Sequence, residues 1–456
     1  MLSNVKNTNT SEDGASFIAK KEALGKGITV ASDLVVDHAN QCSITMTNGQ
    51  SYLDMTSGIG VASTGHCHPT VVKAVQDQVG KMSHAQINMF YHAPLLELMD
   101  RLRPYTAPLD TFCFNNSGSE AVESAIKLAR HATKKKNIIV FNGGHHGRTI
   151  GAMALTGSKN MFSAGFGPLM PGVFYVDYPY SFRCSASTFE GHSPDHCVKE
   201  IMRQLNVLLK QRCHPDDTAA ILIEPVLGEG GYVPAPKGFF QELRAFCDQH
   251  KILMIADEVQ TGFGRTGKMF AIEHWNTVPD IMVLAKGIAS GYPLSAIVSR
   301  KELMDLQPPG SMGGTFVGNI VACTAAVATL DVFEQEHVLK NVQERSIQVF
   351  GLLEKKLSSA NGASGLPESI MPLDIRGLGL MIGLEFGNAP QGFAARVVKH
   401  ARDHEHLLLL TASIYETIRM IPPLVVDADT LEDSVNRLVK SIVQVANDMK
   451  NEGLIQ

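Results

Sequence analysis

The sequence has no apolar run long enough to cross a membrane and no Cys-x-x-Cys pair among its eight scattered cysteines. In a chain of 456 residues, such cysteines predict reduced thiols and a cytoplasmic location rather than a disulfide framework. A formal net charge of −5 gives no basic footprint for nucleic acid. The first 17 residues lack the apolar core of a signal peptide and the arginine bias of a transit peptide, and they predict a disordered lead-in. We therefore expect a globular protein without membrane or nucleic-acid partners.

Short apolar runs alternate with amphipathic stretches from about residue 110 onward. The stretch 119–132 has apolar residues at helical spacing, and the stretch 238–250 behaves similarly. Strands that are apolar on both faces and alternate with helices are typical of a mostly parallel sheet between two helical layers. The predicted fold class is therefore α/β, with ligands bound beyond the carboxyl ends of the strands. The predicted strands are 111–114, 137–141, 173–177, 219–226, 251–259 and 280–287.

The pattern changes after residue 330, where a long amphipathic stretch, 430–450, accompanies two short strand candidates, 380–386 and 418–424. A chain of this length can form more than one domain. We expect a smaller α/β domain at the carboxyl end, completed by the N-terminal segment. The predicted division is 1–70 for the N-terminal part of the small domain, 71–330 for the large domain and 331–456 for the rest of the small domain.

Two of the predicted strands end in groups that can bind a charged ligand. Ser117, Gly118 and Ser119 follow the first strand and open a predicted helix, whose exposed N–H groups could bind a phosphate. A simple N-cap with Glu120 in the first turn explains the same residues. Asp257 ends another strand, where a half-buried carboxylate needs a cationic or N–H partner, although a turn aspartate is an equally good interpretation.

Two further strand ends carry ionisable residues. Glu224 and Glu229 come after the apolar run 219–223, and a solvated loop with two acidic residues is the plainer interpretation of them. Lys286 ends the strand 280–287 among small neighbours, so an exposed surface position does not suit it. A desolvated lysine has a lowered pKa and can form a Schiff base with an aldehyde.

Together, a phosphate-binding turn, an acid and a Schiff-base lysine match the needs of pyridoxal 5′-phosphate. The lysine would hold the aldehyde carbon, the acid would keep the pyridine nitrogen protonated, and the turn would anchor the phosphate. All three lie at strand ends of one predicted sheet, which indicates a single cofactor site.

At this point the chain resembles the class III aminotransferases, which have pyridoxal-phosphate fold type I, from about Tyr52 to the segment 418–424. It is most similar to the 4-aminobutyrate and ω-amino acid transaminases. The resemblance implies transfer of an amino group from an ω-amino acid or primary amine to a keto acid, 2-oxoglutarate or pyruvate, by a ping-pong mechanism. It also implies a homodimer with shared active sites. The matching stretches are TSGIGVASTGHCHP, FNNSGSEAVESAIKLAR, HHGRT, IEPVLGEGG, ADEVQTGFGRTG, LAKGIASGYPLSA and GGTFVGN.

The resemblance also implies roles for single residues around the cofactor. Lys286 is similar to the Schiff-base lysine and Asp257 to the acid that pairs with the pyridine nitrogen. The remaining cofactor positions are Gln260 at the ring hydroxyl, Val259 on one ring face, Ser117, Gly118 and Ser119 at the phosphate, and Thr315 at the phosphate of the other subunit.

For the substrate, the resemblance implies that Arg148 binds a distal carboxylate and that Glu229 and Arg419 form a gated pair. In that pair Arg419 binds the α-carboxylate of a keto acid, and Glu229 neutralises it when an amine occupies the site. Two residues depart from the family pattern: His145 replaces an aromatic ring that stacks on the cofactor, and Asn88 replaces a glutamine. An imidazole covers less area than that ring and can titrate. Further substrate positions are Ile59, Asn88 and Glu224.

Other functions fit the sequence less well. The segment 262–267, GFGRTG, matches the dinucleotide fingerprint, but it does not directly follow a strand, so an NAD oxidoreductase is a remote alternative. No histidine group has zinc spacing, and no metal site is expected. A pseudoenzyme would be expected to lose Lys286 or Asp257. A dialkylglycine-type decarboxylase, an amino-group mutase or a phospho-lyase remains possible, because pocket contacts decide the outcome of the shared chemistry.

Overall fold

The computed structural model describes residues 21–184, 194–357, 366–367, 370–371 and 373–455. Among these residues, no helix combines the length and apolar character that a membrane crossing needs. The predicted lead-in, residues 1–17, lies outside the described residues.

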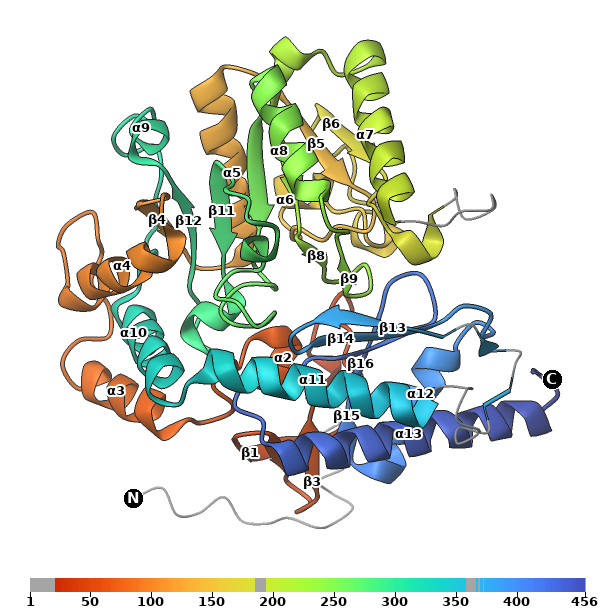
Figure 1. Ribbon diagram of the computed structural model, residues 1–456. Coiled ribbons are helices and arrows are strands. Elements are labelled where there is room, and N and C mark those ends of the chain that lie inside the picture. Colours follow the sequence, from red (N-terminus) through yellow and green to blue (C-terminus); the bar gives the residue numbers. More distant parts are fainter. Residues whose placement is uncertain (1–20, 185–193, 358–365, 368–369, 372, 456) are drawn as a thin grey trace.

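A central sheet of seven strands forms the core of the larger part of the molecule (Figure 1). Only β12 runs against its neighbours, which confirms the predicted mostly parallel sheet. The spatial order is β4 (Thr111–Asn115), β12 (Ser295–Ser299), β11 (Ile281–Leu284), β10 (Leu253–Asp257), β7 (Thr218–Ile223), β5 (Asn137–Phe141) and β6 (Val173–Val176).

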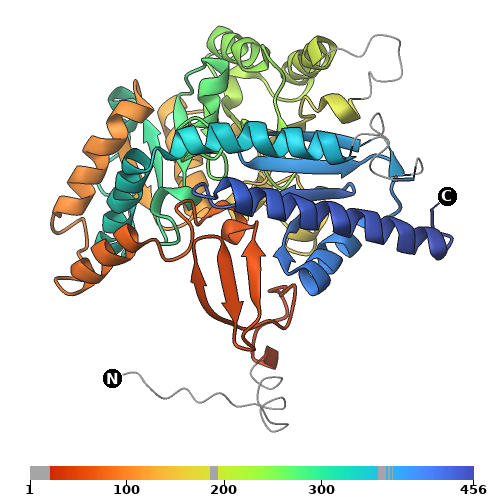
Figure 2. The ribbon, with the colours of Figure 1, turned by 60° about the horizontal axis from the view of Figure 1, so that its bottom comes forward.

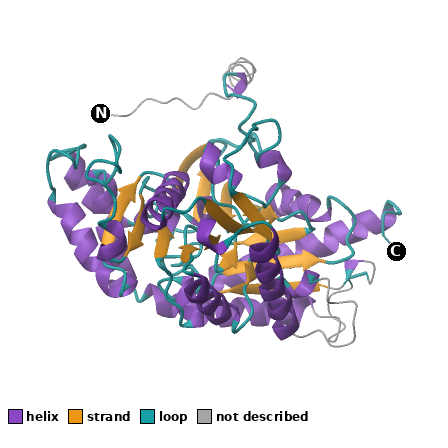
Figure 3. Cartoon of the chain, turned by 90° about the horizontal axis from the view of Figure 1, so that it is seen from above, coloured by secondary structure: helices purple, strands orange, loops and turns teal. Residues whose placement is uncertain are grey.

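Helices cover both faces of this sheet, as Figure 3 shows from above. Successive side chains of a strand point to opposite faces, so Ile138 and Val140 of β5 join one buried cluster while Ile139 and Phe141 join the other. The first cluster is shared with α5, and the second with α7 and α8. This explains why the strands have apolar residues on both faces. The covering helices are α5 (Gly118–Thr133), α7 (Pro194–Gln211) and α8 (Phe239–His250).

Helix α5 forms where the apolar spacing predicted it. Val122, Ala125, Ile126 and Ala129 are all buried against the sheet. A capping box closes its N-terminus, and the helix ends before Lys134, which takes the left-handed conformation. Its first turn therefore lies directly beyond the carboxyl end of β4.

Segments from the N-terminal and C-terminal regions lie side by side in the smaller part of the molecule (Figure 2). The C-terminal strand β15 pairs in parallel with the N-terminal strand β3. This pairing supports the expected association of the N- and C-terminal segments, and the division at residues 70 and 330 stays a prediction. One sheet has the order β1 (Val36–Asn40), β2 (Ser43–Met46), β3 (Ser51–Asp54), β15 (Leu407–Leu408), and the other has the order β13 (Leu373–Leu378), β14 (Met381–Phe386), β17 (Thr417–Met420), β16 (Leu410–Ala412).

Two long helices, α11 (Val338–Leu357) and α13 (Ala428–Asn451), pack together across the smaller part (Figure 1). Helix α13 covers the stretch 430–450 that the sequence predicted. A short hairpin, β8 (Val226–Leu227) with β9 (Val233–Pro234), follows β7. The other α-helices are α2 (Ser57–Gly60), α3 (Pro69–Val79), α4 (Ala93–Thr106), α6 (Ile150–Ala154), α9 (Lys301–Met304), α10 (Ile320–Gln335) and α12 (Phe393–Glu405).

The buried Glu385 of β14 joins the two parts of the molecule. Arg183, from the segment after β6, donates from Nε to Glu385 at 2.6 Å, and Arg376 of β13 donates from Nη2 at 2.7 Å. The hydroxyl groups of Tyr180 and Thr417 also hydrogen-bond to this carboxylate. A buried carboxylate needs such partners, and the network fixes the smaller sheet against the end of the larger one.

Candidate active site

A cavity of about 330 Å³ lies beyond the carboxyl ends of β4, β10 and β11. This is the edge of the sheet at which ligands were expected. The structure thus brings together most residues of the predicted cofactor site from separate segments of the chain. The predicted residues that line the cavity are Ser117, Gly118, Ser119, His145, Glu224, Asp257, Val259, Gln260 and Lys286.

Lys286 begins a short 3₁₀ turn (Lys286–Ala289) directly after β11. The backbone of Lys286 has a φ of +48°, which residues other than glycine rarely adopt. This conformation turns the chain away from the direction of β11. Burial lowers the pKa of the Lys286 amine, and the nearby Glu229 only partly offsets this. Within the described part of the chain, its Nζ has no hydrogen bond or ion pair. Such an amine is suited to nucleophilic attack.

Asp257 is 2% exposed and is oriented by two donors. His146 hydrogen-bonds from Nδ1 to Oδ2 at 2.6 Å, and the backbone N–H of Val259 donates to Oδ1 at 3.0 Å. Burial opposes a charge on His146, but the hydrogen bond and charge of Asp257 raise its pKa overall. The two donors fix the orientation of the Asp257 carboxylate at the cavity wall. Sequence reasoning missed His146, and its position next to His145 in HHGRT was the available signal.

The turn at residues 117–119 forms an N-cap for α5 and is also able to bind an anion. The Ser117 hydroxyl accepts from the Glu120 N–H at 3.3 Å, and Glu120 accepts from the Asn116 N–H at 2.7 Å. The predicted N-cap is therefore present. Helix geometry still leaves the N–H groups of Gly118 and Ser119 without an intrahelical acceptor at the cavity wall. An anion can be bound there without disturbing the cap.

The cavity fits a substituted pyridine with a phosphate group. Gln260 is 6% exposed, and its buried Oε1 has no hydrogen-bond partner among the described residues. A ring hydroxyl would supply the missing donor. Val259 lies against Gly118, where a Cβ atom would come within 3.1 Å of the Val259 side chain. Glycine at position 118 thus leaves room for Val259 to face the cavity.

His145 occupies the predicted ring-stacking position as a neutral imidazole. Burial lowers its pKa to about 4, so it carries no charge near pH 7. Its ring packs edge-on against Phe162, with centroids 4.9 Å apart, and Nδ1 lies 3.4 Å from the Ser158 hydroxyl. The ability of imidazole to titrate is therefore not available to this site at physiological pH.

Glu224 and Glu229 do not form a solvated loop, so the plainer interpretation of these residues was wrong. Glu224 is 4% exposed and accepts from the backbone N–H groups of His145 at 2.7 Å and Gly228 at 2.8 Å. Burial raises the pKa of Glu224 to about 7. Glu229 forms an ion pair with Arg419 of β17 at 2.6 Å, and the side chain of Arg419 is 4% exposed. Sequence pattern does not reveal burial of a loop between sheets.

Six predicted residues are not part of this cavity wall: Glu229 and Arg419, described above, and four others. Thr315 and Asn88 are on the segments before α10 and α4, and Ile59 is 41% exposed in α2. Arg148 is exposed, with its guanidinium 4.7 Å from the centroid of the Phe162 ring. The role predicted for Thr315 belongs to the site of another subunit. The roles of all four stay predictions.

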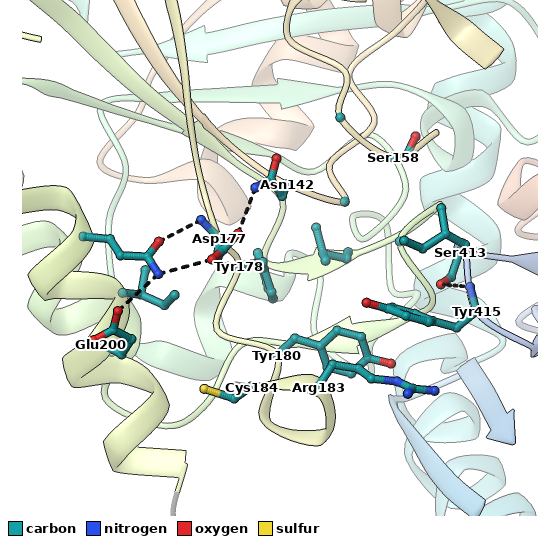
Figure 4. A pocket seen from close by; sticks show the side chains of 17 residues that line it. Asn142, Ser158, Asp177, Tyr178, Tyr180, Arg183, Cys184, Glu200, Ser413 and Tyr415 are labelled. Carbon is teal, nitrogen blue, oxygen red and sulfur yellow. Dashed lines mark hydrogen bonds between the residues drawn. The ribbon is translucent and has the colours of Figure 1, made fainter. Parts of the chain in front are cut away.

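A second cavity, of about 450 Å³, lies beyond the ends of β5, β6 and β7. Figure 4 shows Asn142 and Asp177 on one side of it and Ser413 and Tyr415, from the turn between β16 and β17, on the other. Asn142 donates to Asp177 at 2.8 Å, so this carboxylate already has a partner. Ser158 lines the second cavity and contacts His145, which lines the first cavity. These two residues therefore lie between the cavities.

The alternatives to a pyridoxal-phosphate site receive no support from the geometry. The segment 262–267 forms turns and opens no helix, unlike a dinucleotide fingerprint. His66 hydrogen-bonds to Asp54 at 2.7 Å, and His68 caps α3. In the described ranges, no group of three or more His, Cys, Asp or Glu side chains could hold a metal ion. Part of the histidine-containing stretch 190–197 lies outside those ranges.

Comparison with known proteins identifies the family of the chain. The family model for aminotransferase class III matches residues 27–442. The chain is 40% identical to the 4-aminobutyrate aminotransferase GabT of Escherichia coli K12, over 94% of this chain and 97% of the relative. It is 36% identical to the 5-aminovalerate aminotransferase DavT of Pseudomonas aeruginosa, over 96% of this chain and 100% of the relative. A solved amine transaminase from an uncultivated Pseudomonas species, in its PLP-bound form, is 28% identical with a TM-score of 0.83, and the match covers 92% of this chain and 98% of that one.

Proposed function

The chain belongs to the class III aminotransferase family, and from this premise we propose that it moves the amino group of an ω-amino acid to a keto acid. Enzymes of this family depend on pyridoxal phosphate. Relatives named for 4-aminobutyrate and 5-aminovalerate support a donor whose amino group is far from its carboxylate. The observation that carries the proposal is the buried ion pair between Glu229 and Arg419, which would let one pocket accept a donor without an α-carboxylate and a keto acid that has one.

The cavity residues supply contacts for each part of the cofactor. We infer that the N–H groups of Gly118 and Ser119 bind the phosphate, that Gln260 accepts the ring hydroxyl, and that Val259 and His145 cover the two ring faces. Asp257, held by His146, stabilises a proton on the pyridine nitrogen. When bound, pyridoxal phosphate supplies the aldehyde that receives the amino group and a ring that delocalises electrons from the reacting carbon.

Lys286 is the proposed catalytic base. Its Nζ is the group that would hold the aldehyde carbon of the bound cofactor, and it would be a free amine once the donor occupies that position. Because burial lowers its pKa, the free amine is more readily neutral and can take a proton from the donor carbon. The same nitrogen would carry that proton to its destination within the cavity. The second half-reaction reverses these transfers with a keto acid, either 2-oxoglutarate or pyruvate.

The Glu229–Arg419 pair explains how one pocket serves two unlike substrates. An ω-amino acid places no carboxylate next to its amino group, so Arg419 would be an unpaired buried cation without Glu229. A keto acid has a carboxylate next to the reacting carbon, and this group matches the bidentate geometry of arginine. Glu229 must then move away. The exposed Arg148 is the proposed contact for the donor's distal carboxylate.

We also infer a homodimer that shares its active sites. Apolar side chains are exposed on two segments next to predicted site residues: Met89, Phe90 and Tyr91 follow Asn88, and Phe316 follows Thr315. Tyr91 is 82% exposed and Phe316 is 60% exposed. Exposed apolar residues of this size favour contact with another protein surface. A second copy would cover them and bring Thr315 to the phosphate of the neighbouring site.

A cytoplasmic location is consistent with the state of the cysteines. All eight are free thiols. Burial and the neighbouring Cys184 raise the pKa of the Cys197 thiol to about 12, and no disulfide joins the two. Neighbouring thiols that remain unlinked favour a reducing compartment.

The proposal is tested by mixing the cofactor-loaded enzyme with ω-amino acids of increasing length and following the cofactor's absorbance. Donors of four or five carbons should convert the cofactor to its aminated form, and a keto acid should then restore the original spectrum. Lys286→Ala should abolish both changes and still bind the cofactor. The proposal is wrong if only α-amino acids react. Release of carbon dioxide or phosphate would instead favour the decarboxylase or phospho-lyase alternatives.

A further inference from the structure

Behind the Glu229–Arg419 ion pair, several buried polar atoms have no hydrogen-bond partner among the described residues. They include the hydroxyl of Tyr232, Nε of Arg419 and Nη2 of Arg265. Tyr232 is 0% exposed, and the guanidinium carbon of Arg419 lies 5.7 Å from the centroid of its ring. Buried polar groups without partners are rare in folded proteins. Their presence at one place indicates that the ion-paired state leaves hydrogen bonds unmade.

The environment of Tyr232 makes its oxygen a hydrogen-bond acceptor. Burial raises the pKa of its hydroxyl to about 12, so it remains protonated at neutral pH. Both Arg419 and Arg265 act on this hydroxyl electrostatically, and Arg419 also lies close enough for a side-chain hydrogen bond, although no well-aligned bond joins the two groups in the ion-paired state. Arginine has donors only, so an oxygen between two guanidinium groups can interact with them only by accepting. Arg265 donates from Nη1 to the carbonyl oxygens of Leu380 and Pro422.

The backbone around Tyr232 holds the ring in place by a strained conformation. Its φ of +56° lies in the left-handed region, which is unfavourable for a bulky residue. The preceding Gly231 is fixed by Arg376, whose Nε donates to its carbonyl oxygen at 3.0 Å. Strain of this kind is concentrated at functional sites. Here it sets the ring beside Arg419, directly after the segment that carries Glu229.

We propose that the Tyr232 hydroxyl positions Arg419 by accepting a hydrogen bond from its Nε when a keto-acid carboxylate replaces Glu229. The inference rests on the proposed role of Arg419 in the second half-reaction. In the ion-paired state Nη1 of Arg419 donates to Glu229 at 2.6 Å. No well-aligned hydrogen bond joins Nε of Arg419 to the Tyr232 hydroxyl in this state. A carboxylate bound end-on by the two Nη atoms leaves Nε in need of an acceptor. Tyr232 is then the group that keeps the guanidinium plane facing the substrate.

The test compares two acceptors on the aminated, cofactor-loaded enzyme: a keto acid and a simple aldehyde that lacks the carboxylate. Tyr232→Phe keeps the ring and removes only the hydroxyl. This substitution should lower kcat/KM for the keto acid about tenfold, mainly by raising KM. A tenfold change corresponds to about 1.4 kcal/mol. The kcat/KM for the aldehyde should change by less than about twofold, which is the size of effect that substitutions away from a functional contact usually have. Calorimetric binding of a non-reactive dicarboxylate should weaken by a similar factor of about ten.

Two controls separate the possible failures. Tyr52→Phe, in β3 with its ring packed edge-on against His406, should leave both acceptors unchanged. Arg419→Ala should discriminate between the acceptors more strongly than Tyr232→Phe. If Arg419→Ala discriminates and Tyr232→Phe does not, Tyr232 has no positioning role. If neither variant discriminates, the proposed role of Arg419 fails as well. An equal loss for both acceptors in Tyr232→Phe would mark the hydroxyl as merely structural.

Discussion

Replacing Arg419 by alanine should damage one half-reaction and spare the other. The guanidinium is 4% exposed and 2.6 Å from Glu229, so water does not compensate for its loss. A charge-assisted hydrogen bond contributes about 1.5–3 kcal/mol, and a bidentate contact lies at the upper end of that range. A loss of about 3 kcal/mol lowers kcat/KM for the keto acid roughly 150-fold. An amine donor without an α-carboxylate makes no such contact and should react at a rate close to that of the wild type.

The same substitution leaves Glu229 without its cation. Burial opposes the charge on Glu229, and Arg419 is the main reason that its pKa is nevertheless lowered. Without Arg419 this pKa should rise, and a protonated Glu229 would limit the loss of stability. Breaking a buried ion pair can cost about 3–5 kcal/mol, and we expect less here because the Glu229 side chain is 15% exposed.

Single-turnover spectroscopy of the two half-reactions measures the effect directly. Arg419→Lys is the informative comparison, because lysine keeps the charge and lacks the planar fork, so it should restore little of the keto-acid reaction. Glu229→Gln tests the other partner and should slow the amine half-reaction more than the keto-acid half-reaction. Equal damage by Arg419→Ala to both halves, or none to the keto-acid half, would refute the gate and point to Arg148 or another group.

Three further predictions follow from the buried ionisable groups. Asp257→Asn should lower turnover by two or more powers of ten, because a buried charge pair contributes on the order of 3–5 kcal/mol; steady-state rates within a few-fold of wild type would contradict its pairing with the ring nitrogen. His145→Tyr should keep activity and slow cofactor loss modestly, since aromatic stacking adds about 0.5–1.5 kcal/mol; a large drop in turnover would instead reveal a chemical role for the imidazole. Burial raises the pKa of Glu224 from 4.5 to about 7, so the folded state binds the proton of this carboxyl more tightly than the unfolded state does. The contribution of Glu224 to the free energy of unfolding therefore falls as pH rises from 4.5 to 7. Glu224→Gln should therefore gain about 2–3 kcal/mol relative to wild type between pH 5 and pH 8 in chemical denaturation, and a pH-independent difference would show that Glu224 ionises normally.

Local pattern alone was sufficient for much of the fold. Each predicted strand of the central sheet is present, and β5 and α8 nearly coincide with their predicted ranges. A strand of a parallel sheet that is apolar on both faces must be buried on both faces, and helices packed on each side of the sheet provide that burial. Lys286 at the end of such a strand could also be singled out, because a cation next to a buried run is costly to desolvate unless a partner or a chemical role compensates for it.

The sequence by itself determined the elements, the α/β class and the groups at the strand ends, since these depend on spacing within a short window. Only the tertiary structure decided which of those groups are buried and which meet. Glu229 and Arg419 are 190 positions apart and come together because the smaller sheet that contains β17 packs against the β8–β9 hairpin. Glu224 is buried beside His145 and Gly228, and His146 reaches Asp257 across 111 positions. Ion pairing and desolvation depend on distances of a few ångströms between distant segments, and no local periodicity encodes those distances.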